Sequence, residues 1–201
     1  MWPWGHLAVG YLCYSLLARA IDRRVSALAV VAVAAGTQFP DLIDKPLAWS
    51  LAVLPNGRSL AHSLITATLV GLVLFAVART VDARVDTRQV GTDGGTGLVR
   101  PAAVHLVGAF MLGYGSHLLS DGLHAIVDGE FAVLAYLGWP LLPAIQYGGP
   151  KSFVGHFAAM ELTPFLALEF VLAGLALVVW YTDGRPGLHV VRRTLNRARN
   201  Q

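Results

Sequence analysis

The sequence predicts an all-α, polytopic membrane protein: a helical bundle of about five transmembrane helices with one interfacial or re-entrant segment. Apolar residues make up 55% of the 201 residues and charged residues only 13%, whereas a soluble domain carries about 25% charged residues. The mean hydropathy is +0.58. This composition excludes a disordered chain and a basic nucleic-acid-coating protein, so we expect no nucleic-acid partner.

Five stretches that are nearly free of charge predict the membrane crossings. They are residues 1–18, 25–40, 59–78, 101–120 and 162–182. A helix needs about 17–25 residues to cross the hydrocarbon, so the first two can cross only with little tilt or where the bilayer is thin. Residues 131–150 are also uncharged, but glycines and prolines interrupt them, which predicts the interfacial or re-entrant segment.

The basic residues predict the orientation. With five crossings and the N-terminus outside, Lys45, Arg58 and Lys151 lie outside. The other twelve of the fifteen basic residues lie on the cytoplasmic side: Arg19, Arg23, Arg24, Arg79, Arg84, Arg88, Arg100, Arg185, Arg192, Arg193, Arg197 and Arg199. This is a strong positive-inside bias. We therefore expect residues 1–183 to form one transmembrane domain in the cell membrane and residues 184–201 a basic cytoplasmic tail.

Ionisable side chains gather at the outer ends of these spans. Along the chain they are His6, Asp41, Asp44, Arg58, His62, His117 and Asp121. The predicted orientation places all of them on one side, whereas residues that only mark helix ends would fall on both sides. Because an ionisable residue at the rim of the hydrocarbon is costly, such a group is a functional hypothesis.

The residue types are those of a metal site. Imidazole and carboxylate ligands suit zinc, iron or manganese, and the single cysteine, Cys13, excludes a site built on thiolates. His117 and Asp121 lie four residues apart, one helical turn, so both can point at one ion. Arg58 and His62 have the same spacing. His62 could bind the metal while the planar guanidinium of Arg58 holds a phosphate or carboxylate.

Each residue also has a purely structural interpretation. Asp41 and Asp44 could lie in a loop, with Asp41 capping the next helix. His124 and His156 are more readily satisfied by local contacts, and a bundle-facing hydrogen bond would explain Glu169 in the middle of the last span. The joint pattern, and no single residue, therefore favours a site.

Four motifs follow one another along residues 1–145. They are WPWGH, FPDLIDK, GRSLAHSL and GYGSHLLSDGL, the last followed by LGWPLLP. Together they resemble the YdjM-like membrane-bound metal-dependent hydrolases, a family that is similar to the zinc-dependent phospholipase C and single-strand nuclease superfamily. The resemblance implies that the metal ligands are His6, Asp41, His62, His117 and Asp121, with Asp121 bridging two ions.

This sequence also differs from the soluble enzymes of that superfamily. In the soluble enzymes the N-terminal Trp amine is a ligand, whereas Met1 precedes Trp2 here, so we expect one or two ions, most simply zinc, rather than three. His124, and His156 with Glu161, are only loosely similar to the later ligands of those enzymes.

We expect hydrolysis of a phosphoester, in a lipid or lipid-linked substrate, at the outer membrane interface. A bound divalent ion lowers the pKa of its water from 15.7 to about 7 and so provides hydroxide. Asp44, or Asp41 if Asp41 does not bind metal, would take the proton, and Arg58 would stabilise negative charge on the phosphoryl group.

Two other classes of function fit parts of the sequence. A metal-ion transporter or metal-handling protein would use the same ligands in transit, with Glu169 the only hint of a pathway across the membrane. A non-catalytic scaffold would use the arginine-rich tail to bind a partner or anionic lipid. The sequence leaves the oligomeric state open.

Overall fold

The computed structural model describes residues 1–89, 102–144 and 152–188, and within them the chain forms helices and no strand. The all-α class is thus confirmed for this part of the chain. The elements are α1 (Pro3–Ala20), α2 (Ala27–Lys45), the π-helical turn η1 (Pro46–Ser50), α3 (Leu64–Gln89), α4 (Ala103–Val127), the 3-10 helix η2 (Phe131–Gly138), α5 (Phe153–Ala158) and α6 (Pro164–Thr182).

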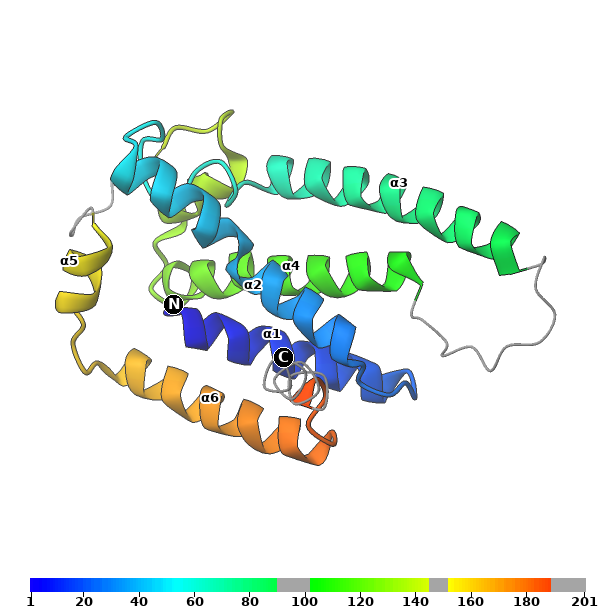
Figure 1. Cartoon of the computed structure of the whole chain (residues 1–201). Coiled ribbons are helices and arrows are strands. Elements are labelled where there is room, and N and C mark those ends of the chain that lie inside the picture. Colours follow the sequence, from blue (N-terminus) through cyan, green and yellow to red (C-terminus); the bar gives the residue numbers. More distant parts are fainter. Residues whose placement is uncertain (90–101, 145–151, 189–201) are drawn as a thin grey trace, which may run out of the picture.

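The long helices α1, α2, α3, α4 and α6 alternate in direction along the chain (Figure 1). α1 packs against α2, α4 and α6, while α4 also packs against α2 and α3. The starts of α1, α3 and α6 and the ends of α2 and α4 therefore lie at the same end of the bundle, which we call the site end.

Caps explain where several helices begin. The hydroxyl of Ser26 accepts a hydrogen bond from the amide of Ala29 at the start of α2, and Thr163 accepts one from Leu166 at the start of α6. α4 lacks a side-chain cap of its own. Instead Asp82 of α3 accepts hydrogen bonds from the amides of the first two residues of α4, at 2.7 and 3.1 Å, which ties the two helices together away from the site end.

Length and hydropathy confirm three of the five expected membrane spans. Among the described residues, Ala27–Ser50, Leu64–Val85 and Pro164–Thr182 are long and apolar enough to cross a membrane. α1 and α4 form helices where the other two spans are expected, but histidines and other polar side chains lower their hydropathy.

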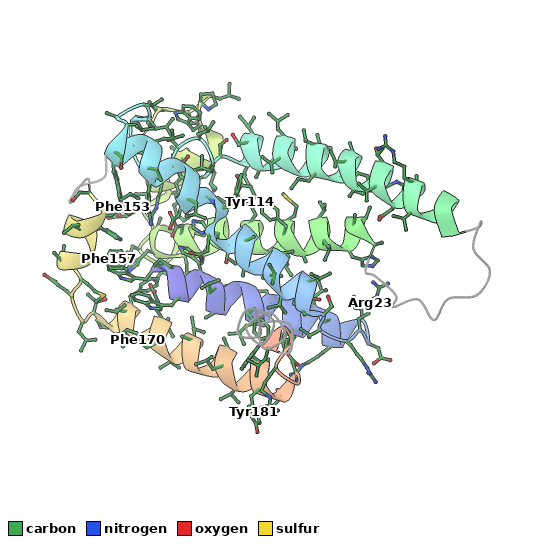
Figure 2. The ribbon with its side chains drawn as sticks, viewed as in Figure 1. Arg23, Tyr114, Phe153, Phe157, Phe170 and Tyr181 are labelled. Carbon is green, nitrogen blue, oxygen red and sulfur yellow. The ribbon has the colours of Figure 1, made fainter. Side chains whose placement is uncertain are left out.

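Apolar side chains cover the outside of the bundle. Only 11% of the most apolar part of α3 is buried, and Leu69 and Leu72 on that helix are 58% and 61% exposed. Figure 2 shows Tyr181 pointing away from the bundle, whereas Tyr114 lies inside it. An apolar exterior around a core that holds histidines, aspartates and serines is the arrangement of a membrane protein.

α2 and α4 approach each other at two glycines. A Cβ atom added to Gly36 would lie 2.0 Å from the carbonyl oxygen of Phe110, and one added to Gly113 would lie 2.3 Å from that of Val33. Their backbones are thus in direct contact, as is common for helices that pack through small residues in membranes. This crossing brings the last turns of α2 against α4 at the site end.

The structure differs from two local expectations. Asp41 and Asp44 lie in the last turns of α2, with Pro40 inside the helix, rather than in a loop. Arg58 and His62 precede α3, which begins at Leu64 and not at residue 59. The described part of 131–150 begins with η2, whose eight residues are too short to cross a membrane; that this segment is interfacial or re-entrant stays a prediction.

Two of the expectations concern residues that the structure does not describe. They are the remainder of the re-entrant segment, 145–150, and the basic tail beyond residue 188.

A group of polar side chains connects α1 to α6 at the end of the bundle opposite the site end. The carboxylate of Asp183 accepts hydrogen bonds from the hydroxyls of Tyr11 and Ser15 and from the guanidinium of Arg19, each at 2.7 Å. Burial by itself would raise the pKa of Asp183, but hydrogen bonds from Ser15, Tyr11 and Arg19 hold it below its usual value.

Candidate metal centre

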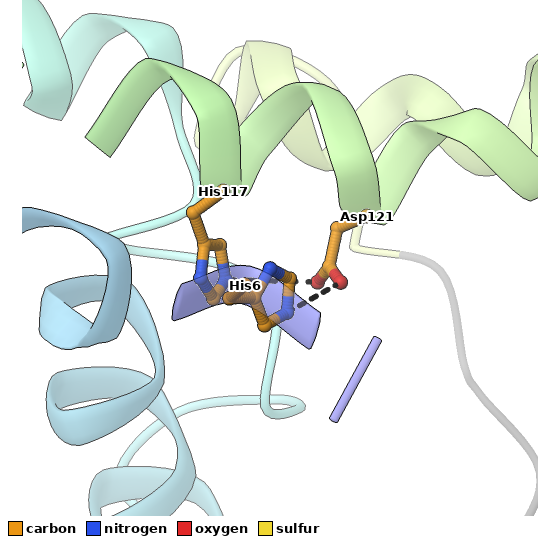
Figure 3. A group of neighbouring side chains, drawn as sticks. All are labelled: His6, His117 and Asp121. Atoms are coloured by element: carbon orange, nitrogen blue, oxygen red, sulfur yellow. Dashed lines mark ion pairs between the residues drawn. The ribbon is translucent and has the colours of Figure 1, made fainter. Parts of the chain in front are cut away.

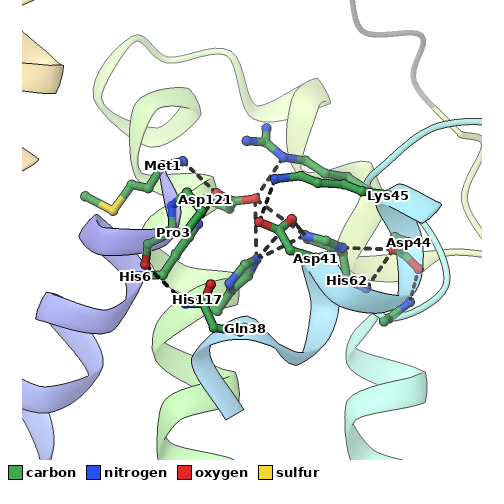
Figure 4. Close-up of polar contacts among 12 residues, drawn as sticks. Met1, Pro3, His6, Gln38, Asp41, Asp44, Lys45, His62, His117 and Asp121 are labelled. Atoms are coloured by element: carbon green, nitrogen blue, oxygen red, sulfur yellow. Dashed lines mark hydrogen bonds and ion pairs between the residues drawn. The ribbon is translucent and has the colours of Figure 1, made fainter. Parts of the chain in front are cut away.

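Six ionisable side chains from four segments meet at the site end (Figure 4), and we call them the polar cluster. They are His6 of α1, Asp41 and Asp44 of α2, His62 before α3, and His117 and Asp121 of α4. The side chains of His62, Asp44 and His117 are 0% exposed, and that of Asp41 is the most exposed at 11%. The sequence expectation that these residues meet at one end of the bundle therefore agrees with the geometry; their roles stay predictions.

The ring of His117 is oriented by the backbone of α2. Its Nδ1 lies 2.6 Å from the carbonyl oxygen of Thr37, and since a carbonyl only accepts hydrogen bonds, Nδ1 carries the hydrogen. Thr37 follows Gly36, whose carbonyl has no helical donor because Pro40, four residues later, lacks a backbone N–H. His117 Nε2 is therefore left with its lone pair directed into the cluster.

The ring of His62 is oriented by Asp44. The Nδ1 atom of His62 lies 2.8 Å from Asp44 Oδ2, and the same carboxylate accepts hydrogen bonds from the amides of Ser59, Ala61 and His62. Both oxygens of this carboxylate accept hydrogens from amides, so Nδ1 of His62 carries the hydrogen of their contact. Burial by itself would lower the pKa of His62, but the carboxylates of Asp121 and Asp44 raise it above its usual value.

The ring of His6 is oriented by a hydroxyl. Ser120 Oγ donates to the carbonyl oxygen of His117 at 3.0 Å and therefore accepts from Nδ1 of His6 at 2.9 Å. His6 stacks on His117 with ring centroids 3.7 Å apart (Figure 3). Its buried Nε2 has no hydrogen-bond partner, although Asp121 Oδ1 lies 3.2 Å away.

Three imidazoles thus present their Nε2 atoms to one small volume. The Nε2 atoms of His62 and His117 are only 3.1 Å apart, which is hydrogen-bond distance, so without a cation one of them carries a hydrogen that the other accepts. Zinc–nitrogen bonds of about 2.0–2.1 Å in a tetrahedron place neighbouring ligand atoms about 3.3 Å apart. A divalent cation between the rings would replace that hydrogen and use both nitrogens as ligands.

Two carboxylates complete the set of ligand atoms. Asp121 Oδ2 lies 3.5 Å from Nε2 of His62 and 3.8 Å from that of His117. Asp41 Oδ1 lies 3.6 and 3.9 Å from the same two atoms. These separations are close to the edges of a tetrahedral site, and the donor set of nitrogen and oxygen atoms suits a divalent transition metal.

The ligand atoms form two overlapping groups, His6 with His117 and Asp121, and Asp41 with His62 and His117; in each, all atoms lie within 4.8 Å of one another. Asp121 has one oxygen toward His6 and the other toward His62 and His117. This is the arrangement of a carboxylate that can bridge two ions, as the family resemblance implies.

Positive charges surround the two carboxylates. Lys45 Nζ lies 2.6 Å from Asp41 Oδ2, Arg58 Nε lies 2.8 Å from Asp121 Oδ2, and the amine of Met1 lies 2.9 Å from Asp121 Oδ1. The side chain of Arg58 is 30% exposed, so its guanidinium lies at the rim of the cluster.

The remaining candidate ligands of the sequence analysis lie outside the polar cluster. His124 forms a pair with Asp128 at the surface, with 61% of its side chain exposed, and Glu161 is exposed in the segment between α5 and α6. The ring of His156 lies beside that of Trp2 with centroids 4.6 Å apart. Glu169 is 1% exposed and accepts a hydrogen bond from the amide of Trp2, but it belongs to neither group of ligand atoms among the described residues.

Sequence reasoning missed three residues that orient the candidate ligands, Lys45, Ser120 and Thr37. Lys45 could have been found, because it lies four residues after Asp41 on the helix. No sequence pattern indicates a role for Ser120, apart from its position next to Asp121. The contribution of Thr37 is a backbone carbonyl, which no side-chain pattern indicates.

The chain was compared with known families and proteins. The sequence profile of the family described as YdjM inner membrane protein matches residues 1–185, which includes the last helix, α6, beyond the four motifs. No curated protein matches the chain, and no solved structure matches it.

Proposed function

Because this chain belongs to the YdjM inner membrane protein family, we propose that it is a membrane-embedded, metal-dependent hydrolase that acts on a phosphoester in a lipid or lipid-linked substrate. The observation that carries the proposal is the common arrangement of His6, His62 and His117. Each ring has its Nδ1 hydrogen bonded to an oxygen and its Nε2 directed at the others. Such outer contacts orient metal-binding histidines in proteins.

In this proposal a first ion is held by His62, His117, Asp41 and Asp121. Asp121 Oδ1 and the otherwise unpartnered Nε2 of His6 would hold a second. A divalent ion at this place supplies an activated water and polarises the phosphoryl oxygen.

The residues around the ligands orient them and bind the phosphate of the substrate. Asp44 is fully buried and holds the Nδ1 hydrogen of His62, so we assign it to positioning rather than to proton transfer. Lys45 holds one oxygen of Asp41 so that the other faces the histidines. Arg58, at the rim, stabilises negative charge on the phosphoryl group.

The same proposal includes a topology. All five long helices cross the membrane, the N-terminus and the site end lie outside, and twelve of the fifteen basic residues lie in the cytoplasm. The histidines that α1 and α4 contribute to the polar cluster, His6 and His117, are turned into the bundle, where they are 1% and 0% exposed. A polar residue inside the bundle avoids contact with lipid.

The test is metal content together with hydrolysis. We expect the purified chain to hold one or two divalent ions by elemental analysis and to cleave a phosphodiester probe. His117→Ala and Asp121→Ala should lose both properties, because His117 belongs to both groups of ligand atoms and Asp121 has an oxygen toward each of the two proposed ions. His124→Ala is the matched control, since its exposed ring contacts only surface groups.

Unchanged metal content in both variants would end the metal-centre proposal. Metal flux through the chain in liposomes, without hydrolysis, would favour a transporter instead.

A further inference from the structure

An apolar groove lies on the other side of α4 from the interior of the polar cluster. It has a volume of about 420 Å³ and is lined by side chains of α1, α4 and α6. α1 packs against both of the other helices. Leu119 and Leu123 of α4 and Leu168 of α6, which line it, are 73%, 40% and 45% exposed, so the groove faces the lipid in a membrane-spanning bundle.

The groove and the polar cluster share a wall. Ser120 lines the groove, and its hydroxyl accepts the Nδ1 hydrogen of His6 at 2.9 Å. Met1 also lines the groove, and its amine lies 2.9 Å from Asp121. A molecule in the groove would therefore have its polar end within reach of the candidate ligands.

The size of the groove fits one lipid chain. Its lining on α4 runs from Met111 to Leu123, which at 1.5 Å per residue is about 18 Å. One leaflet of the hydrocarbon core is about 15 Å thick, half of roughly 30 Å. The volume of about 420 Å³ lies in the usual range of ligand sites, about 300–1,000 Å³.

The geometry points to a substrate site in which this groove holds one acyl chain of a glycerophospholipid, with the phosphate of that lipid at the polar cluster beside Arg58. The inference rests on the proposed function and deepens it, because it names the lipid class and the part of the protein that binds its chain. The floor of small and apolar side chains, including Gly115, Val9 and Cys13, provides contact along the chain without a polar group to satisfy.

The test uses a phosphatidylcholine whose acyl chain carries a diazirine at its middle, at trace level in nanodiscs of phosphatidylcholine that hold the full chain. After illumination, peptide mapping locates the adducts. In the wild-type chain we expect several-fold more adducts on groove residues such as Cys13 and Leu168 than on Leu69 and Leu72 of α3, which face lipid outside the groove.

A groove-filling variant sharpens the test. A Cβ atom added to Gly115 meets nothing within 4 Å, so Gly115→Phe should fill the groove and remove most of the groove adducts while bound metal is retained. Gly108→Phe is the matched control. Gly108 lies seven residues earlier on α4, has equally open space at its Cβ position and does not line the groove, so its adduct pattern should match that of the wild-type chain.

The outcomes distinguish a failure of the acyl-chain site from a failure of the proposed hydrolase function. Adducts spread evenly over the groove and α3 in a chain that binds a divalent ion would overturn the acyl-chain site alone. A dimer of the chain in the nanodiscs whose groove residues carry no adducts would overturn it as well, because a second copy would then cover the groove. Groove-specific adducts in a chain that binds no divalent ion would overturn the hydrolase and leave the acyl-chain site standing.

Discussion

The Nε2 atoms of His62 and His117 face each other at 3.1 Å, although each ring already gives its Nδ1 hydrogen to an oxygen. The two oxygens belong to different parts of the chain, the side chain of Asp44 and the backbone of Thr37. Neither ring can turn to avoid the other without breaking its own hydrogen bond. The fold therefore holds the two nitrogens at a distance that either a hydrogen on one of them or a cation bound by both would satisfy.

Asp44→Asn should weaken metal binding without abolishing it. The change removes the charge that fixes the His62 ring, and loss of such an outer partner lowers metal affinity about 10–100-fold. Competition with a chelator measures the affinity, and Asp128→Asn, at an exposed pair with His124, is the control. Affinity equal to that of the wild-type chain would show that Asp44 has no positioning role.

Arg58→Ala should lower hydrolysis while the metal content stays the same. Removing one donor to a developing negative charge costs about 10²–10³-fold in rate, and the guanidinium lies at the rim rather than among the ligand atoms. Turnover of a phosphodiester probe and elemental analysis measure the two quantities, and Arg58→Lys should recover part of the rate. If the bound metal falls in parallel with the rate, Arg58 acts through Asp121 instead.

Gly113→Ala should destabilise the bundle, and Gly108→Ala should not. A Cβ atom at Gly113 would lie 2.3 Å from the carbonyl oxygen of Val33, whereas at Gly108 it meets nothing within 4 Å. Overpacking of this kind costs about 1–3 kcal/mol, whereas alanine in an open helical position is favoured over glycine by about 1 kcal/mol. Thermal unfolding in detergent compares the variants; equal melting temperatures would contradict the close crossing of α2 and α4.

Asp183→Asn should destabilise the chain in a pH-dependent way. Hydrogen bonds to a charged group contribute about 1.5–3 kcal/mol, and the pKa of Asp183 is lowered in the folded chain. The contribution of ionised Asp183 to the free energy of unfolding is therefore complete above the pKa of an unfolded Asp, about 3.9. It is lost as the pH falls through the lower pKa that Asp183 has in the folded chain.

The melting-temperature difference between the wild-type chain and Asp183→Asn should thus be constant from about pH 8 to pH 5 and shrink below about pH 4. Asp128→Asn, with a 51% exposed side chain, is the control. A difference that grew on acidification would mean that the folded chain prefers the protonated carboxyl group.

The proposed orientation predicts the fate of reporter fusions. A reporter enzyme that is active only outside the cytoplasm should work when fused after Gly57 and fail when fused after Arg84, because these positions lie at opposite ends of α3. The reversed pattern would place the polar cluster on the cytoplasmic side. Equal activity at both positions would contradict a crossing by α3.

The order of the helices could be predicted from the sequence because spans require uncharged stretches, and those are visible by counting. The meeting of His6, His62, His117 and Asp121 could be predicted as well, since alternating helices return to the same end. The positions of Asp41 and Asp44 could not, because a Pro-Asp sequence predicts a loop as readily as the last turns of a helix that contains a proline.

Alone, then, the sequence determined that the chain is helical, that it belongs in a membrane and which ionisable side chains gather at one end of the bundle, because composition and charge spacing depend only on the order of residues. The tertiary structure decided which nitrogen of each histidine faces its neighbours. That choice depends on oxygens from Thr37, Asp44 and Ser120, whose distances to the rings are set by how closely α1, α2 and α4 pack.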